Sequence, residues 1–271
     1  MVVKLHYTTQ GQGKPVFIIH GLLGSSRNWS SFSKKLSESF QVVTLDLRNH
    51  GQSGHADTMT YADMASDILA LMEDFGMERA SFIGHSMGGK VAMTFALQHR
   101  SMIEQLVIMD IAPVSYKNEL LPLLDAMTGL PLGDITSRTH ADSLLSLHVP
   151  DSSLRLFLLQ NLIQDGENYR WRVNLNSIRK SLIDIDGFPA PVSVKSHPVR
   201  TLFLGGAESG YLKPHHYPIV KKYFPRAQIH IIDGAGHWLH IDKPDKVLEM
   251  VQSFLSSEDS TEPPSLLYGR S

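Results

Sequence analysis

One serine between spaced glycines is the residue best suited to nucleophilic chemistry in this chain. Gly84, Ser86 and Gly88 form the pattern G-x-S-x-G within "FIGHSMGGKVAM". The residues before the serine are typical of a strand and those after it of a helix, which predicts a sharp turn at Ser86. Side chains at the two glycines would collide with the neighbouring strand and helix. The turn would lift the Ser86 hydroxyl to a helix N-terminus, which favours negative charge. We therefore interpret Ser86 as a nucleophile.

The motif alone does not identify a nucleophile, because a non-catalytic glycine-rich turn could have the same sequence. Other catalytic residues must accompany it. The stretch "GQSGH" also has a serine, Ser53, among glycines. No helix pattern follows it and the second spaced glycine is missing, so we interpret Ser53 as a turn residue.

A serine nucleophile needs a base, and the chain has 14 histidines. The stretch "DGAGHWLH" favours His237, because a loop after the last expected strand could reach back to the serine. We expect His240 to pack or to face solvent, and His215 and His216 to lie on a solvated helix face. No histidine pair at helical spacing stands with a carboxylate, so we predict no metal site.

Attack on a carbonyl also needs two N–H donors for the developing oxyanion. We expect one from Met87, which follows the serine. The other should come from "HGLLGS", the loop after the first buried strand, where Leu22 is the candidate because the glycines around it let its N–H turn inward. His20 in the same loop is expected to pack rather than to transfer protons.

Alternating strand and helix patterns must position these residues. Residues 2–9 alternate like an early antiparallel strand, and six short apolar runs are typical of buried strands. Four helix patterns separate or follow them, and this alternation predicts the α/β class with a mostly parallel sheet covered by helices on both faces. The apolar runs are 15–21, 41–51, 80–86, 105–113, 199–206 and 227–237, and the helix patterns are 27–40, 60–76, 87–99 and 243–257.

The alternation stops once, over residues 114–196, where no buried strand is expected. Helices are predicted there over 116–127, 138–148, 152–163 and 174–185. We interpret this segment as a helical cap inserted between two late strands. Residues 1–113 and 197–257 would form the core. The polar tail 258–271 is expected to be disordered and is given no function.

Composition excludes several other classes of function. The net charge of −2 leaves no electrostatic footprint for nucleic acid. The chain has no cysteine, which excludes disulfides and thiolate metal sites and suits the cytoplasm. No apolar run reaches membrane-spanning length, and "MVVKLHYTTQ" lacks the apolar core of a signal peptide. We therefore expect a cytoplasmic protein without a membrane span.

Five stretches together resemble a known family. "HGLLGS", "DLRNHGQS", "GHSMGG", "MDIAPV" and "GAGHW" are similar to those of α/β-hydrolases, over about residues 15–255 and least in the helical insertion. "RNHG" with "DIAPVSY" resembles, more narrowly, the bacterial YbfF esterases and their mitochondrial ABHD11-like relatives. The resemblance implies an α/β-hydrolase fold with a helical cap. It also implies a serine hydrolase that acts on acyl esters or thioesters through an acyl-enzyme, with no cofactor.

The family also implies a carboxylate that orients the histidine. It usually follows the strand after the cap, where this sequence has Glu208 in "LFLGGAESGYL". The YbfF-like branch has asparagine there, and its acid follows the preceding strand, which here gives Asp110 in "VIMDIAP". We expect Asp110 to be the acid, with Glu208 as the alternative, because the longer Glu208 must fold back to reach imidazole. Asp110 could instead cap the loop that leads to the cap.

Two other functions are compatible with these motifs. A carbon–carbon bond hydrolase would use the same triad. A non-catalytic ligand-binding protein could retain the fold, although such proteins often lose a triad member, and both Ser86 and His237 are present here. Reaction of Ser86 with a fluorophosphonate probe would separate an enzyme from a binding protein.

Overall fold

A single seven-stranded sheet organises the chain. The structure, a computed structural model, describes residues 1–117, 120–189 and 196–257, so the expected tail 258–271 lies outside the described residues. The strands are ordered β1-β3-β2-β4-β5-β8-β9. β1 is antiparallel to β3 and the other neighbouring pairs are parallel, which confirms the predicted α/β class. The strands are β1 Tyr7–Gln10, β2 Pro15–Ile19, β3 Gln41–Leu45, β4 Ala80–His85, β5 Ile103–Met109, β8 Thr201–Gly206 and β9 Ala227–Ile232.

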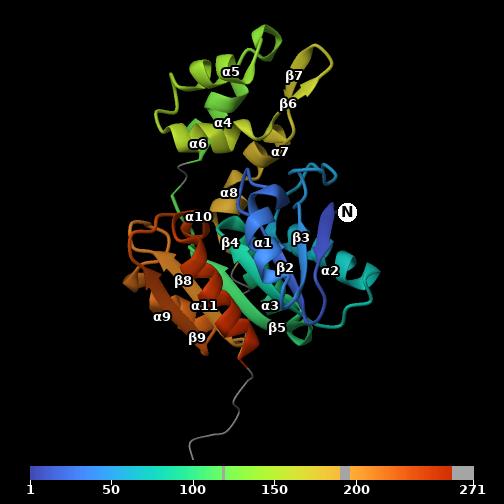
Figure 1. Cartoon of the computed structure of the whole chain (residues 1–271), viewed down its shortest axis with the longest axis vertical. Coiled ribbons are helices and arrows are strands. Elements are labelled where there is room, and N and C mark those ends of the chain that lie inside the picture. The colour runs from blue at the N-terminus through green and yellow to red at the C-terminus, as the bar shows by residue number, and fades with distance from the viewer. Residues whose placement is uncertain (118–119, 190–195, 258–271) are drawn as a thin grey trace, which may run out of the picture.

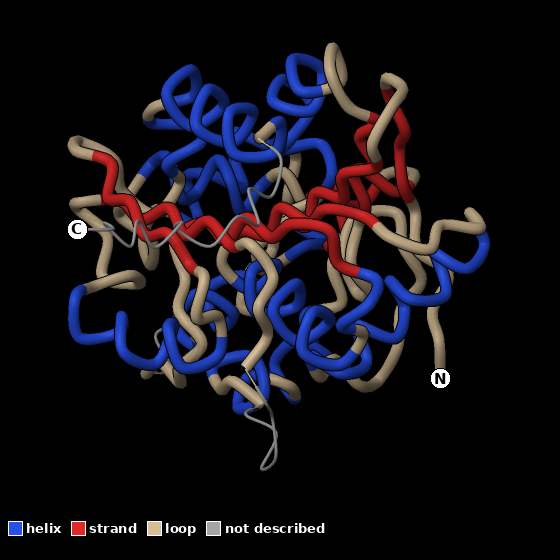
Figure 2. Tube along the Cα trace, turned by 90° about the horizontal axis from the view of Figure 1, so that it is seen from below, coloured by secondary structure: helices blue, strands red, loops and turns tan. Residues whose placement is uncertain are grey.

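Helices cover both faces of this sheet, as Figure 2 shows from below. The buried strands explain the arrangement, because alternate side chains of β2 enter two different cores. Phe17 and Ile19 pack in one core, and Val16 and Ile18 in the other. The first core is completed by α2 (Tyr61–Asp74), α3 (Met87–Gln98) and α9 (Tyr217–Tyr223), and the second by α1 (Ser30–Leu36), α10 (Leu239–Asp242) and α11 (Pro244–Ser256).

The segment between β5 and β8 forms a separate lobe, drawn in green to yellow in Figure 1. We call residues 114–196 the cap segment. Its helices are α4 (Leu121–Thr128), α5 (Arg138–Leu145), α6 (Ser152–Leu159), α7 (Leu175–Lys180) and α8 (Leu182–Asp186), with the 3-10 turn η3 (Leu132–Asp134) between α4 and α5.

The expectation of helices alone in the cap segment was wrong at one place. β6 (Leu162–Asp165) and β7 (Asn168–Trp171) form an antiparallel hairpin around a two-residue loop that begins with Gly166 at φ 64°. Only Leu162 of the eight strand residues is buried, so no continuous apolar run marks either strand. The predicted helix 152–163 accordingly ends at Leu159.

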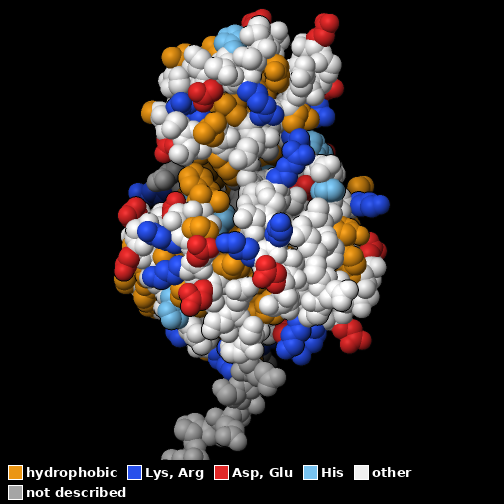
Figure 3. Space-filling model, viewed as in Figure 1, with side chains coloured by type: hydrophobic (Ala, Val, Ile, Leu, Met, Phe, Trp, Pro, Cys, Tyr) orange, Lys and Arg blue, Asp and Glu red, His pale blue; other side chains and the backbone are white. Residues whose placement is uncertain are grey.

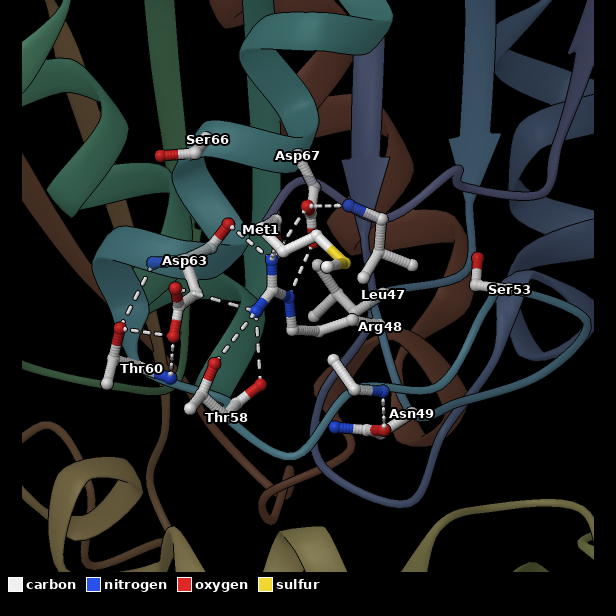
Figure 4. Close-up of polar contacts among 12 residues, drawn as sticks. Met1, Leu47, Arg48, Asn49, Ser53, Thr58, Thr60, Asp63, Ser66 and Asp67 are labelled. Carbon is white, nitrogen blue, oxygen red and sulfur yellow. Dashed lines mark hydrogen bonds and ion pairs between the residues drawn. The ribbon is translucent and has the colours of Figure 1, made fainter.

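A buried arginine fixes the loop after β3, and Figure 4 shows its contacts. Arg48 donates from Nε and Nη2 to the two carboxylate oxygens of Asp67 on α2, at 2.6 and 2.8 Å. It also donates to the carbonyls of Met1 and Thr58. Both charges of the Arg48–Asp67 pair are buried and paired at two points, the geometry in which such a pair is tolerated.

The same loop also holds the cap segment. Asn49, at φ 65°, accepts the backbone N–H of Asn174 on its carbonyl at 3.0 Å, and its side-chain oxygen accepts Nδ2 of Asn174 at 3.2 Å. Asn174 is also the residue that caps α7. The stretch "RNHG" therefore joins the N-terminus, α2 and the cap segment. In the part of the chain that the structure describes, no helix has the length and apolar character to cross a membrane.

Candidate active site

Ser86 lies on the predicted sharp turn between β4 and α3. Its backbone has φ 52° and ψ −121°, a strained conformation for a residue with a side chain. A Cβ at Gly84 would lie 2.4 Å from the carbonyl oxygen of Gly88, and one at Gly88 would lie 2.3 Å from that of Ile19. Both glycines are thus required by close backbone approach. Ser86 N–H donates to the carbonyl of Met109 at 3.0 Å, which ties the turn to the end of β5.

Strand register brings the other predicted residues to the same edge of the sheet. His85 pairs with Met109, so Ser86 and Asp110 both come directly after paired positions of β4 and β5. His237 lies in the loop after β9. Its Nδ1 lies 2.7 Å from Oδ2 of Asp110, close enough for Nδ1–H to donate to the carboxylate.

Hydrogen bonds hold the Asp110 carboxylate in one orientation. Asp110 is fully buried, has φ 51°, and accepts the N–H of Gly206 on Oδ1 at 2.9 Å. Its Oδ2 accepts the hydroxyl of Ser209 as well as His237. The alternative acid, Glu208, is exposed. The structure therefore brings Asp110 rather than Glu208 to the histidine.

Ser209 was missed by the sequence reasoning. It follows Glu208 in "GGAESGYL", where nothing in its type or spacing marks it out. Its burial and its contact with Asp110 are visible only once β5 and β8 are paired.

The two expected oxyanion donors line the same hollow as Ser86. Met87 is the first residue of α3, so its N–H has no acceptor within the helix. In the loop after β2, Leu23 donates its N–H to Nε2 of His50 at 3.0 Å and adopts φ 60°. Within the described ranges, the N–H of the preceding Leu22 has no protein acceptor. Leu22 and Met87 also line the hollow that contains Ser86.

Two buried histidines, His20 and His50, hold this loop in place by accepting backbone hydrogen bonds. His20 Nε2 accepts the N–H of Leu47 at 3.0 Å, which confirms that His20 packs. Burial lowers the pKa of His20, and burial followed by the neighbouring charge of His20 lowers the pKa of His50 to about 3. Neutral rings can accept the N–H groups of Leu47 and Leu23, whereas a protonated imidazole cannot accept.

Two further histidines form a wall beside His237. His85 Nε2–H donates to the carbonyl of His237 at 2.8 Å, and burial is the largest cause that lowers the pKa of His85 well below its usual value. His240 packs, as expected, because its ring stacks on Trp29 at 4.2 Å. The expectation of a solvated face at 215–216 was only half right, since His215 is exposed and His216 is buried.

A hollow of about 300 Å³ surrounds Ser86 and His237. The cap segment contributes an apolar wall to it. Its other wall comes from the core, including Trp29, Met87 and Tyr211. The apolar residues of the cap segment that line it are Leu120, Leu123, Leu154, Phe157, Leu158 and Ile185.

Lys90 joins the cap segment to the helix that begins at Ser86. Its ammonium donates to the carbonyls of Asp186, the last residue of α8, and of Gly187, which follows it, at 2.9 and 2.6 Å. It also lies 4.8 Å from the ring centre of Tyr116. Burial lowers the pKa of Lys90 to about 7, an effect that the Asp186 carboxylate opposes.

The chain is similar to several known esterases and lipases. The sn-1-specific diacylglycerol lipase ABHD11 of Xenopus laevis is 38% identical over 253 residues, covering 90% of this chain and 80% of that relative. Esterase YbfF of Escherichia coli is 32% identical over 251 residues, covering 91% and 95%. The solved structure of a marine microorganism esterase is 35% identical with a TM-score of 0.90, and covers 93% of this chain and 99% of that one.

The family model described as the alpha/beta hydrolase fold matches residues 14–244. That match includes the serine turn, Asp110 and His237, as well as the whole cap segment. The chain therefore belongs to the α/β-hydrolase family, and its relatives include members of the ABHD11 and YbfF branch that its motifs predicted.

Proposed function

We propose that this chain is a serine esterase that hydrolyses acyl esters or acyl thioesters through an acyl-enzyme. The family and the relatives named as esterases and lipases support a serine hydrolase acting on esters. The observation that carries the mechanism is the 2.7 Å contact between His237 and a fully buried Asp110, in the hollow that also contains Ser86.

Each residue has a role that follows from its position. His237 takes the Ser86 proton on Nε2 as the hydroxyl attacks the acyl carbonyl. Asp110 holds the imidazole by Nδ1 and stabilises the imidazolium, while its own charge is compensated by the Gly206 N–H and the Ser209 hydroxyl. The N–H groups of Leu22 and Met87 stabilise the oxyanion.

The reaction then proceeds in two halves. The alcohol or thiol leaves with the proton that His237 had taken, and Ser86 remains acylated. Water enters, gives its proton to His237 and attacks the acyl carbonyl, and Ser86 departs with that proton. The oxyanion forms in both halves at the same place, so the same two N–H groups serve twice.

The hollow favours an aliphatic acyl chain. Leucines and Phe157 of the cap segment cover it, and burial of each additional methylene is worth about 0.8 kcal/mol. We infer that the cap segment is a lid that sets the acyl-length preference. Exchange of this segment for that of a relative should change the preference while hydrolysis of acetate esters persists.

Replacement of Ser86 tests the proposal. Ser86→Ala removes the nucleophile without adding volume, so turnover of p-nitrophenyl esters should be abolished while the circular dichroism spectrum and thermal midpoint stay as in the wild type. A purified variant that retains turnover within about tenfold of the wild type would contradict the proposal, since loss of a triad nucleophile costs about 10⁶.

A further inference from the structure

A second hollow, of about 380 Å³, lies between the core and the cap segment. The 3-10 turn η1 (Ser26–Trp29) separates it from the active-site hollow, because Asn28 and Trp29 line the active-site hollow and Arg27 lines the second. The core also contributes Gly51, Gln52, Ser53 and His55. The β6–β7 hairpin contributes Ile163 and Arg170, and Arg172 follows directly after β7. We call this the arginine hollow.

Positive charge in the arginine hollow exceeds the negative charge that neutralises it. Arg170 pairs with Asp165 at 2.9 Å, on the surface. The guanidinium groups of Arg27 and Arg172 form no ion pair with any residue that the structure describes. Asp46 lies nearby, but it is buried, and its carboxylate accepts the N–H groups of Ser26 and Gln52.

The like charges come from opposite sides of the junction between cap segment and core. Burial lowers the pKa of Arg172 and the charge of Arg27 lowers it further, whereas the Asp46 carboxylate opposes this effect. Figure 3 shows blue Lys and Arg side chains, with a pale blue histidine near them, where the two parts meet. Like charges that face each other across a junction destabilise it unless an anion lies between them.

We propose that the arginine hollow binds a phosphate group of the substrate, an inference that rests on the proposed esterase function. Guanidinium groups match phosphate oxygens with paired hydrogen bonds, so several of them together suit an anionic phosphate group. The acyl chain lies in the active-site hollow, and the leaving group extends past η1 to the arginine hollow. A nucleotide thioester such as an acyl-coenzyme A and a glycerophospholipid both supply such a phosphate.

Paired substrates that differ in phosphate test this assignment. Arg27→Gln/Arg172→Gln should lower kcat/KM at least about tenfold for a phosphate-bearing substrate, with a much smaller effect on its phosphate-free partner. One pair is decanoyl-coenzyme A with p-nitrophenyl decanoate. The other is dioctanoyl phosphatidylglycerol with dioctanoylglycerol in the same uncharged micelles. The pair that shows the selective loss identifies the source of the phosphate.

A control variant removes the same charge elsewhere. Arg79→Gln/Arg179→Gln takes away two arginines that form surface pairs with Glu104 and Asp125, outside the arginine hollow. For each substrate pair, the ratio of kcat/KM with phosphate to kcat/KM without phosphate should stay as in the wild type. An equal loss with both members of each pair would show a structural effect and overturn the proposal. The proposal would also be overturned if Arg27→Gln/Arg172→Gln had the wild-type kcat/KM for every substrate.

Binding without turnover separates this proposal from the esterase assignment. Ser86→Ala protein should bind coenzyme A or glycerophosphoglycerol in a calorimetric titration, and pantetheine, which has no phosphate, much more weakly. Adding Arg27→Gln/Arg172→Gln should abolish the difference. If the wild type hydrolyses no ester, the proposed function fails while this titration still decides the arginine hollow. Failure to bind either phosphate compound would overturn the proposal.

Discussion

In the proposed mechanism, Asp110 supplies the negative charge that His237 needs. Its carboxylate accepts from Gly206, Ser209 and His237, and it is fully buried. The donors from Gly206 and Ser209 are neutral, so they orient the carboxylate without adding a competing positive charge. An imidazolium formed during attack would therefore meet a carboxylate that is already oriented.

Replacement of this carboxylate should separate the two candidate acids. Asp110→Asn is expected to lower kcat by about 10⁴, because the amide cannot hold His237 in the required tautomer. Glu208→Gln is the matched control, since it changes an exposed side chain on the adjoining loop, and its kcat should remain close to wild type. The reverse order of effects in steady-state assays would assign the acid to Glu208.

Ser209 acts through Asp110 and should have a smaller effect. Ser209→Ala removes one donor to a charged group, which is expected to lower kcat about tenfold and to shift the acid limb of the pH–kcat profile. Ser209→Thr retains the hydroxyl, so its kcat and its pH–kcat profile should both lie close to those of the wild type. A pH profile identical to wild type in Ser209→Ala would show that this serine does not position the acid.

The sequence predicted those candidate site residues that lie in recognisable motifs. Ser86 and His237 could be chosen because a turn motif and a loop after the last strand restrict where they lie. Asp110 and Glu208 could not be separated by spacing, because both follow strand ends. Burial and hydrogen bonding distinguish them, and these depend on how β5 and β8 pair.

At the scale of elements, Lys90 connects two of them. It lies on α3, one turn after Ser86, and donates to the carbonyls at the C-terminal end of α8 in the cap segment. The backbone oxygens at the end of a helix otherwise lack partners. The position of α8 over the hollow, which Ile185 and Asp186 help to line, thus depends on Lys90.

Loss of the Lys90 ammonium should loosen α8. In Lys90→Met, amide hydrogen exchange over Leu182–Asp186 is expected to become about tenfold faster or more, and acyl-length preference should broaden. Exchange in the buried strands β4 and β5 should not change. Lys34→Met, at an exposed position of α1, serves as the control. If the amide exchange rates of α8 in Lys90→Met equal those of the wild type, Lys90 does not hold α8 in position.

The elements that sequence predicted best are the buried ones. Strands β2 to β5 and helices α2 and α3 have continuous or periodic apolar runs that reflect burial on defined faces. The β6–β7 hairpin has mostly exposed or half-buried side chains, so only its turn residues could have signalled it. Arg170 of that hairpin and Arg172 just after it come near Arg27 only where the cap segment meets the core, and no spacing along the chain predicts their proximity.

At the scale of the whole molecule, buried neutral histidines should make the fold sensitive to acid. Burial lowers the pKa of His20 and His85, and lowers that of His50 and His240 to about 3. The unfolded chain binds protons near pH 6.5 that the folded chain does not. Stability is therefore fully present above about pH 6.5 and is lost as pH falls toward the folded-state pKa values.

His240 offers the clearest test of this acid sensitivity. Among the described residues its buried Nδ1 has no partner, and its ring stacks on Trp29, so phenylalanine should fit. The free energy of unfolding of His240→Phe minus that of the wild type should be about 2 kcal/mol larger at pH 5 than at pH 8. His148→Gln, at an exposed position, should follow wild type in urea unfolding at both pH values. A pH-independent difference for His240→Phe would contradict this explanation.

The most direct test of the central claim is detection of the acyl-enzyme. Wild-type protein is mixed with excess p-nitrophenyl decanoate, quenched with acid within the first turnovers and digested for mass spectrometry. We predict a decanoyl adduct on Ser86, absent from Ser86→Ala, which lacks the nucleophile. Turnover without any adduct on Ser86, or an adduct on another residue that persists in Ser86→Ala, would contradict the claim that Ser86 is the nucleophile of this enzyme.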